Sequence, residues 1–202
     1  MARKSKKLAE KKIVTIYCEG QSEVAYFKML SRKYGQINVQ SKQIRIEHIQ
    51  RDRGVKMLEK IAREVHRLPR NKKAEQVYAC FDRDNLARAE LERCGKYARE
   101  HHIRLIFSSI NFEIWILMHF EPVGRAYTAQ QLNQKLSGTA YFQQDYAHFK
   151  GADYDHFLLY RVKTAVMNAR TLLLQRGDDW LTNDPYTNVH QWLGPIYGVS
   201  QY

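Results

Sequence analysis

Short apolar runs alternate along the chain with longer segments whose apolar residues recur every three or four positions. The runs at 13–18, 44–49, 76–81 and 103–107 are rich in β-branched and aromatic residues, which is typical of buried strands. Helical spacing predicts a helix that Ser22 caps and that ends before Gly35, and further helices over 55–68, 86–99 and 112–120. Strand and helix thus alternate four times with short connections. This order predicts an α/β fold, with a parallel sheet of about four strands and helices on both faces.

The pattern changes in kind after residue 121. The chain is polar and rich in Tyr and Gln up to residue 151, and then shows helical spacing over 158–172. A last short helix is predicted over 185–192, with Thr187 as its candidate cap. We therefore divide the chain into a basic tail (1–12), a sheet domain (13–121) and a mainly helical C-terminal region packed on that domain (122–202).

Length and composition fit this division. The chain has 202 residues, of which 44% are hydrophobic and 27% charged, as expected for one α/β domain with a modest appendage. No apolar run approaches the length of a membrane span, and no signal-peptide segment follows the basic N-terminus, so a cytoplasmic protein without a membrane partner is expected. Cys18, Cys80 and Cys94 are far apart and are predicted to be buried free thiols rather than zinc ligands.

The net charge of +12 points to a polyanionic partner. Residues 1–12 contain six Lys or Arg against one Glu, and a second basic concentration lies over 63–73. Neutralised phosphates release counterions, so such a chain favours nucleic acid, although basic tails also serve solubility alone. The residues expected to contact nucleic acid flank the strand ends or their loops: Lys11, Lys12, Arg53 and Arg83.

Three acids fall at the carboxyl ends of the predicted strands, where ligands bind in open parallel sheets. Glu19 directly follows the first strand and precedes Gly20, which allows a tight turn or a close approach. Asp82 and Asp84 follow the third strand. If that strand continues, the two aspartates point to one side about 6–7 Å apart.

The negative charges of such a cluster repel one another and must be offset. Two unpaired carboxylates 4 Å apart repel by about 4 kcal/mol at an effective dielectric constant near 20, so the acids need a cation, a basic partner or a proton. We expect a divalent ion, and Mg²⁺ or Mn²⁺ rather than Zn²⁺, because the donors are oxygen atoms. The alternative is that Asp82 and Asp84 are turn and helix-cap residues.

Other residues carry two interpretations each. Glu23 could face the same site, but a first-turn helix acid favoured by the macrodipole is the preferred explanation. His119 is expected to be packed and hydrogen-bonded rather than a ligand. The tyrosines after residue 125 could stack unpaired bases, or could be ordinary core and surface residues.

Four blocks in consistent order resemble the RloB-like family, which is found in prokaryotic restriction and abortive-infection loci. The blocks are YCEGQSEVAYF at 17–27, CFDRD at 80–84, SINFEIWILMHF at 109–120 and NDPYTNVH at 183–190. Together they extend over nearly the whole chain after the basic tail.

The resemblance implies a Toprim-like fold and a role for each acid. Glu19 would be the general acid/base, and Asp82 and Asp84 the catalytic Mg²⁺ ligands, with Glu113 as a further ligand or a supporting acid. Glu19 is also a candidate ligand of the metal ion. The implied function is a Mg²⁺- or Mn²⁺-dependent nuclease of anti-phage defence, with RNA such as tRNA slightly favoured over DNA. The alternative is a non-catalytic nucleic-acid-binding or regulatory partner of an AAA-type ATPase.

Overall fold

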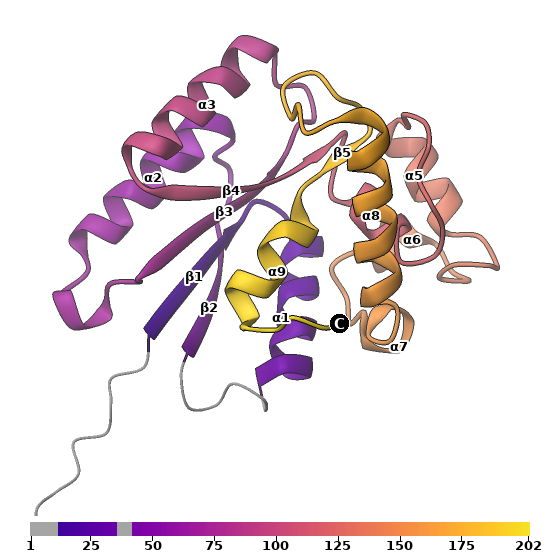
Figure 1. Cartoon of the computed structure of the whole chain (residues 1–202), viewed down its shortest axis with the longest axis horizontal. Coiled ribbons are helices and arrows are strands. Elements are labelled where there is room, and N and C mark those ends of the chain that lie inside the picture. Colours follow the sequence, from indigo (N-terminus) through magenta and orange to yellow (C-terminus); the bar gives the residue numbers. More distant parts are fainter. Residues whose placement is uncertain (1–11, 36–41) are drawn as a thin grey trace, which may run out of the picture.

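A computed structural model describes residues 12–35 and 42–202 and shows a mixed α/β fold (Figure 1). Its five-stranded sheet has the order β2-β1-β3-β4-β5, in which the first four strands are parallel and β5 runs antiparallel to β4. The strands are β1 (Lys12–Cys18), β2 (Lys42–His48), β3 (Gln76–Asp82), β4 (Ile103–Ser109) and β5 (Tyr186–Thr187).

Helices cover both faces of the sheet and form most of the C-terminal region (Figure 1). The helices are α1 (Gln21–Gly35), α2 (Gly54–Arg67), the 3₁₀ turn η1 (Arg70–Lys72), α3 (Arg88–Glu100), α4 (Glu113–Leu117), α5 (Ala129–Leu136), α6 (Tyr146–Phe149), α7 (Asp155–Leu158), α8 (Val162–Arg176) and α9 (Val189–Tyr197).

Alternation along the strands sorts the apolar side chains into two cores. In β3, Tyr78 and Cys80 face the core that α1 and α9 cover, whereas Val77, Ala79 and Phe81 face the core beneath α2 and α3. This is the two-residue period of a strand buried on both faces. The alternation explains why the central strands read as continuous apolar runs.

The predicted four-strand parallel arrangement with helices on both faces is confirmed. The prediction missed the fifth strand, β5, which is two residues long and pairs Tyr186 with Ser109 of β4. Thr187 was wrongly expected to cap a helix over 185–192. It lies in β5, and α9 begins only at Val189.

Other predicted element ends were also wrong. Ser22 does not precede α1 but lies within its first turn, and the helix expected over 112–120 is regular only from Glu113 to Leu117. The helix expected from residue 86 begins at Arg88. Ser22 hydrogen-bonds to Glu113 across 91 residues of sequence, a contact that residue spacing does not encode.

The C-terminal region shares a core with the sheet. Val189, Leu193 and Ile196 of α9 are fully buried in the same apolar cluster as Val14 and Ile16 of β1. The three cysteines are buried free thiols, as predicted. Among the described residues, no helix has both the length and the apolar character needed to cross a membrane.

Candidate acidic site

Five carboxylates gather at the carboxyl edge of the sheet. Glu19 directly follows β1, and its backbone N–H donates to the carbonyl of Cys80 in β3 at 3.0 Å, which ties the two strand ends together. Asp82 is the last residue of β3. Because parallel strands end at the same edge, this pairing brings the first two predicted acids to one place.

Asp84 reaches the site by a turn and not by a continued strand. Strand β3 ends at Asp82, and Asp84 has a φ of +43° with its N–H bonded to the carbonyl of Ile110 at 3.0 Å. The expected i, i+2 strand geometry was therefore wrong. The alternative of a helix cap fails as well, because Ala87 is the N-cap of α3.

Arg53 bridges two of the acids. It is the N-cap residue of α2, and its guanidinium pairs with Glu19 Oε1 and with Asp84 Oδ2, both at 3.1 Å. The Arg53 side chain is 63% exposed, while that of Glu19 is only 13% exposed. The basic partner required by the repulsion argument is thus supplied by the chain itself, and Arg53 can leave toward solvent.

Glu23 lies inside the cluster. It is 2% exposed in the first turn of α1, and a Cβ atom built on residue 20 would overlap its Oε2 atom. Gly20 is therefore needed for the close approach of the Glu23 carboxylate. Glu23 is thus both the first-turn helix acid of the preferred interpretation and a buried member of the cluster, so the two interpretations hold together.

Glu113 completes the group from α4. It is 3% exposed, and its Oε1 accepts a hydrogen bond from the hydroxyl of Ser22 at 3.0 Å. The hydroxyl of Tyr146, in the C-terminal region, donates to the same oxygen at 3.5 Å and contacts Tyr154 at 3.1 Å. The Ser22 hydroxyl therefore hydrogen-bonds to an acid of the site and is not the N-cap of α1.

Burial and mutual repulsion alter the protonation of the cluster. Burial raises the pKa of Glu19 to about 7, with Arg53 opposing the shift and Asp84 adding to it. Burial, then the charge of Glu113, raises the pKa of Glu23 to about 8. Burial also raises the pKa of Asp82 well above its usual value, and the charges of the other four acids add to this rise. That the other four charges all act on Asp82 shows that the five acids form one electrostatic unit.

Three oxygens in this unit have no partner. Glu19 Oε2, Glu23 Oε1 and Asp82 Oδ1 are each shielded from solvent and lack a hydrogen bond. Unpartnered buried oxygens cost free energy, and an all-oxygen donor set is what Mg²⁺ and Mn²⁺ prefer. The chemistry of the donors therefore fits the divalent ion expected from the sequence.

The arrangement of the donors is not a finished metal site. Within residues 12–35 and 42–202, no group of three or more His, Cys, Asp or Glu side chains is placed, as the side chains now stand, to hold a metal ion. Arg53 pairs with one carboxylate oxygen of Glu19 and one of Asp84. An ion bound there would have to displace the guanidinium.

The remaining predicted contact residues lie elsewhere or outside the described chain. Lys12 begins β1 at the opposite end of the sheet, where its ammonium pairs with Glu75 at 3.0 Å. Arg83 donates to the carbonyl of Leu181 at 2.8 Å and so joins the site loop to the C-terminal region. Lys11 lies outside the described residues.

Burial decides the question for His119 and for two of the tyrosines after residue 125, whereas base stacking by exposed tyrosines stays a prediction. His119 is buried, with one ring nitrogen 3.1 Å from the Tyr26 hydroxyl and the other 3.0 Å from the Trp115 carbonyl oxygen, as predicted for a packed histidine. Burial lowers its pKa to about 3. Tyr146 and Tyr154 are core residues, whereas Tyr160 is 89% exposed.

Comparison with known proteins identifies one relationship. A family model described as RloB-like protein matches residues 14–194, which is most of the chain. The comparisons found no matching curated protein and no matching solved structure.

Proposed function

The chain belongs to the RloB-like protein family, and we propose that it is a Toprim-like nuclease that uses Mg²⁺ or Mn²⁺ to cleave phosphodiester bonds in nucleic acid. One observation carries this proposal: a buried carboxylate cluster at a strand edge in which three oxygens have no partner. A purely structural cluster would be expected to satisfy those oxygens.

The acids of the cluster would have two different roles, proton transfer and metal binding. Glu19, whose pKa is raised to about 7, can both accept and donate a proton near neutral pH, as a general acid/base must. Asp82, Asp84 and Glu113 would hold the ion, with the buried Glu23 as a fourth acid beside them. A bound ion would polarise the scissile phosphate and lower the pKa of an attached water.

Arg53 would hold the nucleic acid. Its side chain is largely exposed at the N-terminus of α2, and a guanidinium binds phosphate with two parallel hydrogen bonds. Moving from Glu19 and Asp84 to a phosphate would free two oxygens for the ion.

The substrate class rests on charge and on the family resemblance. The net charge of +12 favours a polyanion, and RNA such as tRNA is slightly preferred over DNA. The same resemblance supports a cytoplasmic role in anti-phage abortive infection, with an AAA-type ATPase as partner.

A cleavage assay tests the proposal. The full chain is incubated with total tRNA, other RNA and single- and double-stranded DNA, each with Mg²⁺, Mn²⁺ or EDTA. We expect metal-dependent cleavage that Asp82→Asn and Glu19→Gln each reduce by at least about a hundredfold. The matched control is Asp52→Asn, which removes a nearby carboxylate that pairs with Lys60 outside the cluster.

One observation favours a second candidate function. Arg53 already neutralises two of the acids, and among the described side chains there is no three-ligand metal arrangement. The protein would then bind nucleic acid without cutting it and regulate a partner ATPase. Intact substrates in every metal, with the ATPase added, together with salt-sensitive binding would support this function over the nuclease.

A further inference from the structure

A second hollow lies at the opposite end of the sheet from the acidic site. It is a cavity of about 440 Å³ between α2 and α3, a size typical of ligand pockets. Its floor includes Val77, the second residue of β3, whereas Asp82 is the last residue of that strand. Five residues of extended chain separate the two, which corresponds to about 16 Å.

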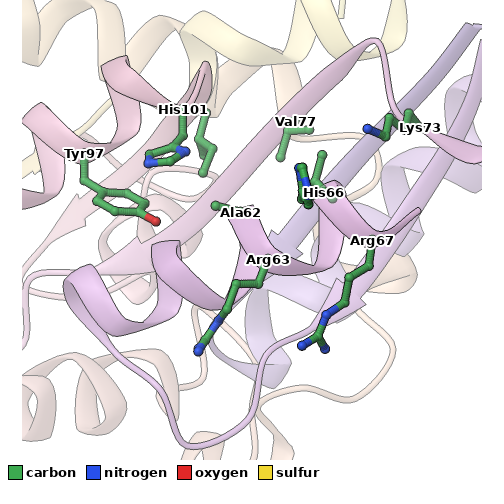
Figure 2. A pocket seen from close by; sticks show the side chains of 10 residues that line it. Ala62, Arg63, His66, Arg67, Lys73, Val77, Tyr97 and His101 are labelled. Atoms are coloured by element: carbon green, nitrogen blue, oxygen red, sulfur yellow. The ribbon is translucent and has the colours of Figure 1, made fainter. Parts of the chain in front are cut away.

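The floor and one wall are apolar or aromatic. Val77 and Ile103 are buried at the base, and Ala62 and Val65 of α2 line one side. At one end of the pocket, the ring of Tyr97 stacks on that of His101, with centroids 4.2 Å apart and planes 24° from parallel (Figure 2). Such a surface accepts a flat, weakly polar group.

The rim is basic. Arg63, His66 and Arg67 project from α2, and Lys73 lies at the other end from Tyr97 (Figure 2). No acidic residue is among those that line the pocket. In the described part of the chain, the cations of Arg63, Arg67 and Lys73 have no ion pair.

This concentration of unpaired charge needs an explanation. Arg63 and Arg67 are four residues apart on one helix, a spacing at which like charges repel. What sets these two arginines apart is their place, because both line a pocket in which no acidic residue is present. An anion bound between them would remove the repulsion, and an arginine fork suits phosphate.

We propose that this pocket binds a nucleoside phosphate, with the base on the apolar floor beside Tyr97 and His101 and the phosphate on Arg63, Arg67 and Lys73. Base–aromatic stacking and charge-assisted hydrogen bonds act on the two halves of such a ligand. The ligand is either a free nucleotide or one nucleotide of a strand. The inference goes beyond the nuclease proposal and does not depend on the acidic site.

Calorimetric titration of the full chain tests the pocket. The probes are adenosine monophosphate, adenosine and inorganic phosphate, with EDTA present so that no metal ion can recruit phosphate to the acidic site. We expect the monophosphate to bind at least about tenfold more tightly than either fragment, because only it engages both halves. Failure of the folded protein to bind it, or equal binding of a fragment, overturns the proposal.

Variants locate the binding. Arg67→Glu should weaken monophosphate binding by at least about tenfold, whereas Lys96→Glu, the same charge change at an exposed α3 position outside the pocket, should not. Circular dichroism establishes that both variants fold. Equal affinity of wild type and Arg67→Glu overturns the proposal. Asp82→Asn should bind the monophosphate like wild type, so loss of cleavage and loss of this pocket are distinguishable.

A competition experiment separates the two sources of the ligand. A short 5′-phosphorylated oligoadenylate is titrated with and without saturating adenosine monophosphate. If the pocket serves a strand, the oligonucleotide binds more tightly than the monophosphate and is displaced by it. If the pocket serves a free nucleotide, the oligonucleotide does not compete, and the monophosphate affinity is unchanged in its presence.

Discussion

Glu23 lies one helical turn beyond Glu19, and its carboxylate is held against the backbone of Gly20. Helix position alone explains an acid in a first turn, which is why sequence spacing did not reveal its place in the cluster. Its role is decided by burial of the side chain, which is 2% exposed, because α1 begins only three residues after β1 ends and so keeps Glu23 at the carboxyl edge of the sheet. Gly20 is the sequence signal that could have indicated this position. An acid that faces solvent does not need a glycine nearby, whereas the buried Glu23 carboxylate does.

The first prediction concerns the pH dependence of stability without metal. The pKa of Glu23 is about 8 in the folded protein, so it keeps its proton up to about pH 8, whereas the unfolded chain releases it near the ordinary glutamate pKa of 4.5. Unfolding therefore releases a proton in this range, so the free energy of unfolding falls as pH rises through it. Glu23→Gln removes this loss, and the variant should be more stable than wild type at pH 8 by at least about 1 kcal/mol.

Urea denaturation at pH 5 and pH 8 in EDTA measures the effect. Glu59→Gln, an exposed acid-to-amide change on α2, is the control and should follow the wild type. If wild type and Glu23→Gln lose the same free energy between the two pH values, Glu23 is not a protonated member of the cluster.

The second prediction concerns the hydrogen bond between Ser22 and Glu113. Ser22→Ala removes the 3.0 Å donor to a buried carboxylate and should destabilise the protein by about 1–3 kcal/mol. Ser31→Ala on the same helix removes only a 3.5 Å contact and should cost less. Thermal denaturation of both variants compares them, and equal costs would contradict a special role for Ser22.

At the scale of elements, the last strand is extended by a side chain. Directly after β5, the Asn188 Oδ1 accepts from the N–H of Phe107 at 2.8 Å, and its Nδ2 donates to the carbonyl of Leu105 at 3.1 Å. The amide thus continues the pairing along the edge of β4 where the backbone turns into α9. It explains how so short a strand stays in register.

The third prediction follows from this bridge. Asn188→Ala leaves an N–H and a carbonyl of β4 unpaired and should lower the free energy of unfolding by about 2 kcal/mol. Asn188→Asp, which loses only the donor to Leu105, should also destabilise. Gln191→Ala, which removes an exposed 3.3 Å contact, is the control. Chemical denaturation in which Asn188→Ala matches this control would show that the bridge does not stabilise the sheet.

Some strands could be located from the sequence more accurately than others. The runs at 13–18, 76–81 and 103–107 were predicted almost to the residue, because a strand buried on both faces has few alternatives to an apolar run. Strand β5 was missed because two residues show no period and its pairing depends on Asn188. For the site, sequence placed Glu19 and Asp82 at one edge. It could not place Arg53 between Glu19 and Asp84, because an ion pair depends on where α2 begins in space.

At the scale of the molecule, charge is divided between the two ends of the sheet. The carboxyl edge carries the five clustered acids, and the amino end carries the cations of the pocket between α2 and α3. The tail contributes further positive charge, with six Lys or Arg in residues 1–12. A polyanion would therefore be attracted by the net positive charge and repelled near the candidate site, unless a metal ion or Arg53 offsets the acids there.

The fourth prediction concerns this positive charge. The logarithm of the nucleic-acid binding constant should fall linearly with the logarithm of salt concentration, with a slope of about −0.7 to −0.9 per phosphate neutralised. Removal of residues 1–11 deletes five Lys or Arg and should flatten the slope. Fluorescence anisotropy with a labelled RNA at several salt concentrations measures both chains. An unchanged slope would mean that the tail makes no phosphate contact and serves solubility.

The Arg53 bridge has a consequence for the order in which ligands bind. One guanidinium can satisfy Glu19 and Asp84 or a phosphate, but it cannot serve both at once. Nucleic acid that draws Arg53 away would raise the affinity of the acids for a metal ion, and by thermodynamic reciprocity the ion would raise the affinity for nucleic acid by the same factor. The candidate site would then remain inert in a cell full of free Mg²⁺ and become active only where substrate is present. On the proposed nuclease function, such linkage would restrict cleavage to places where nucleic acid is bound.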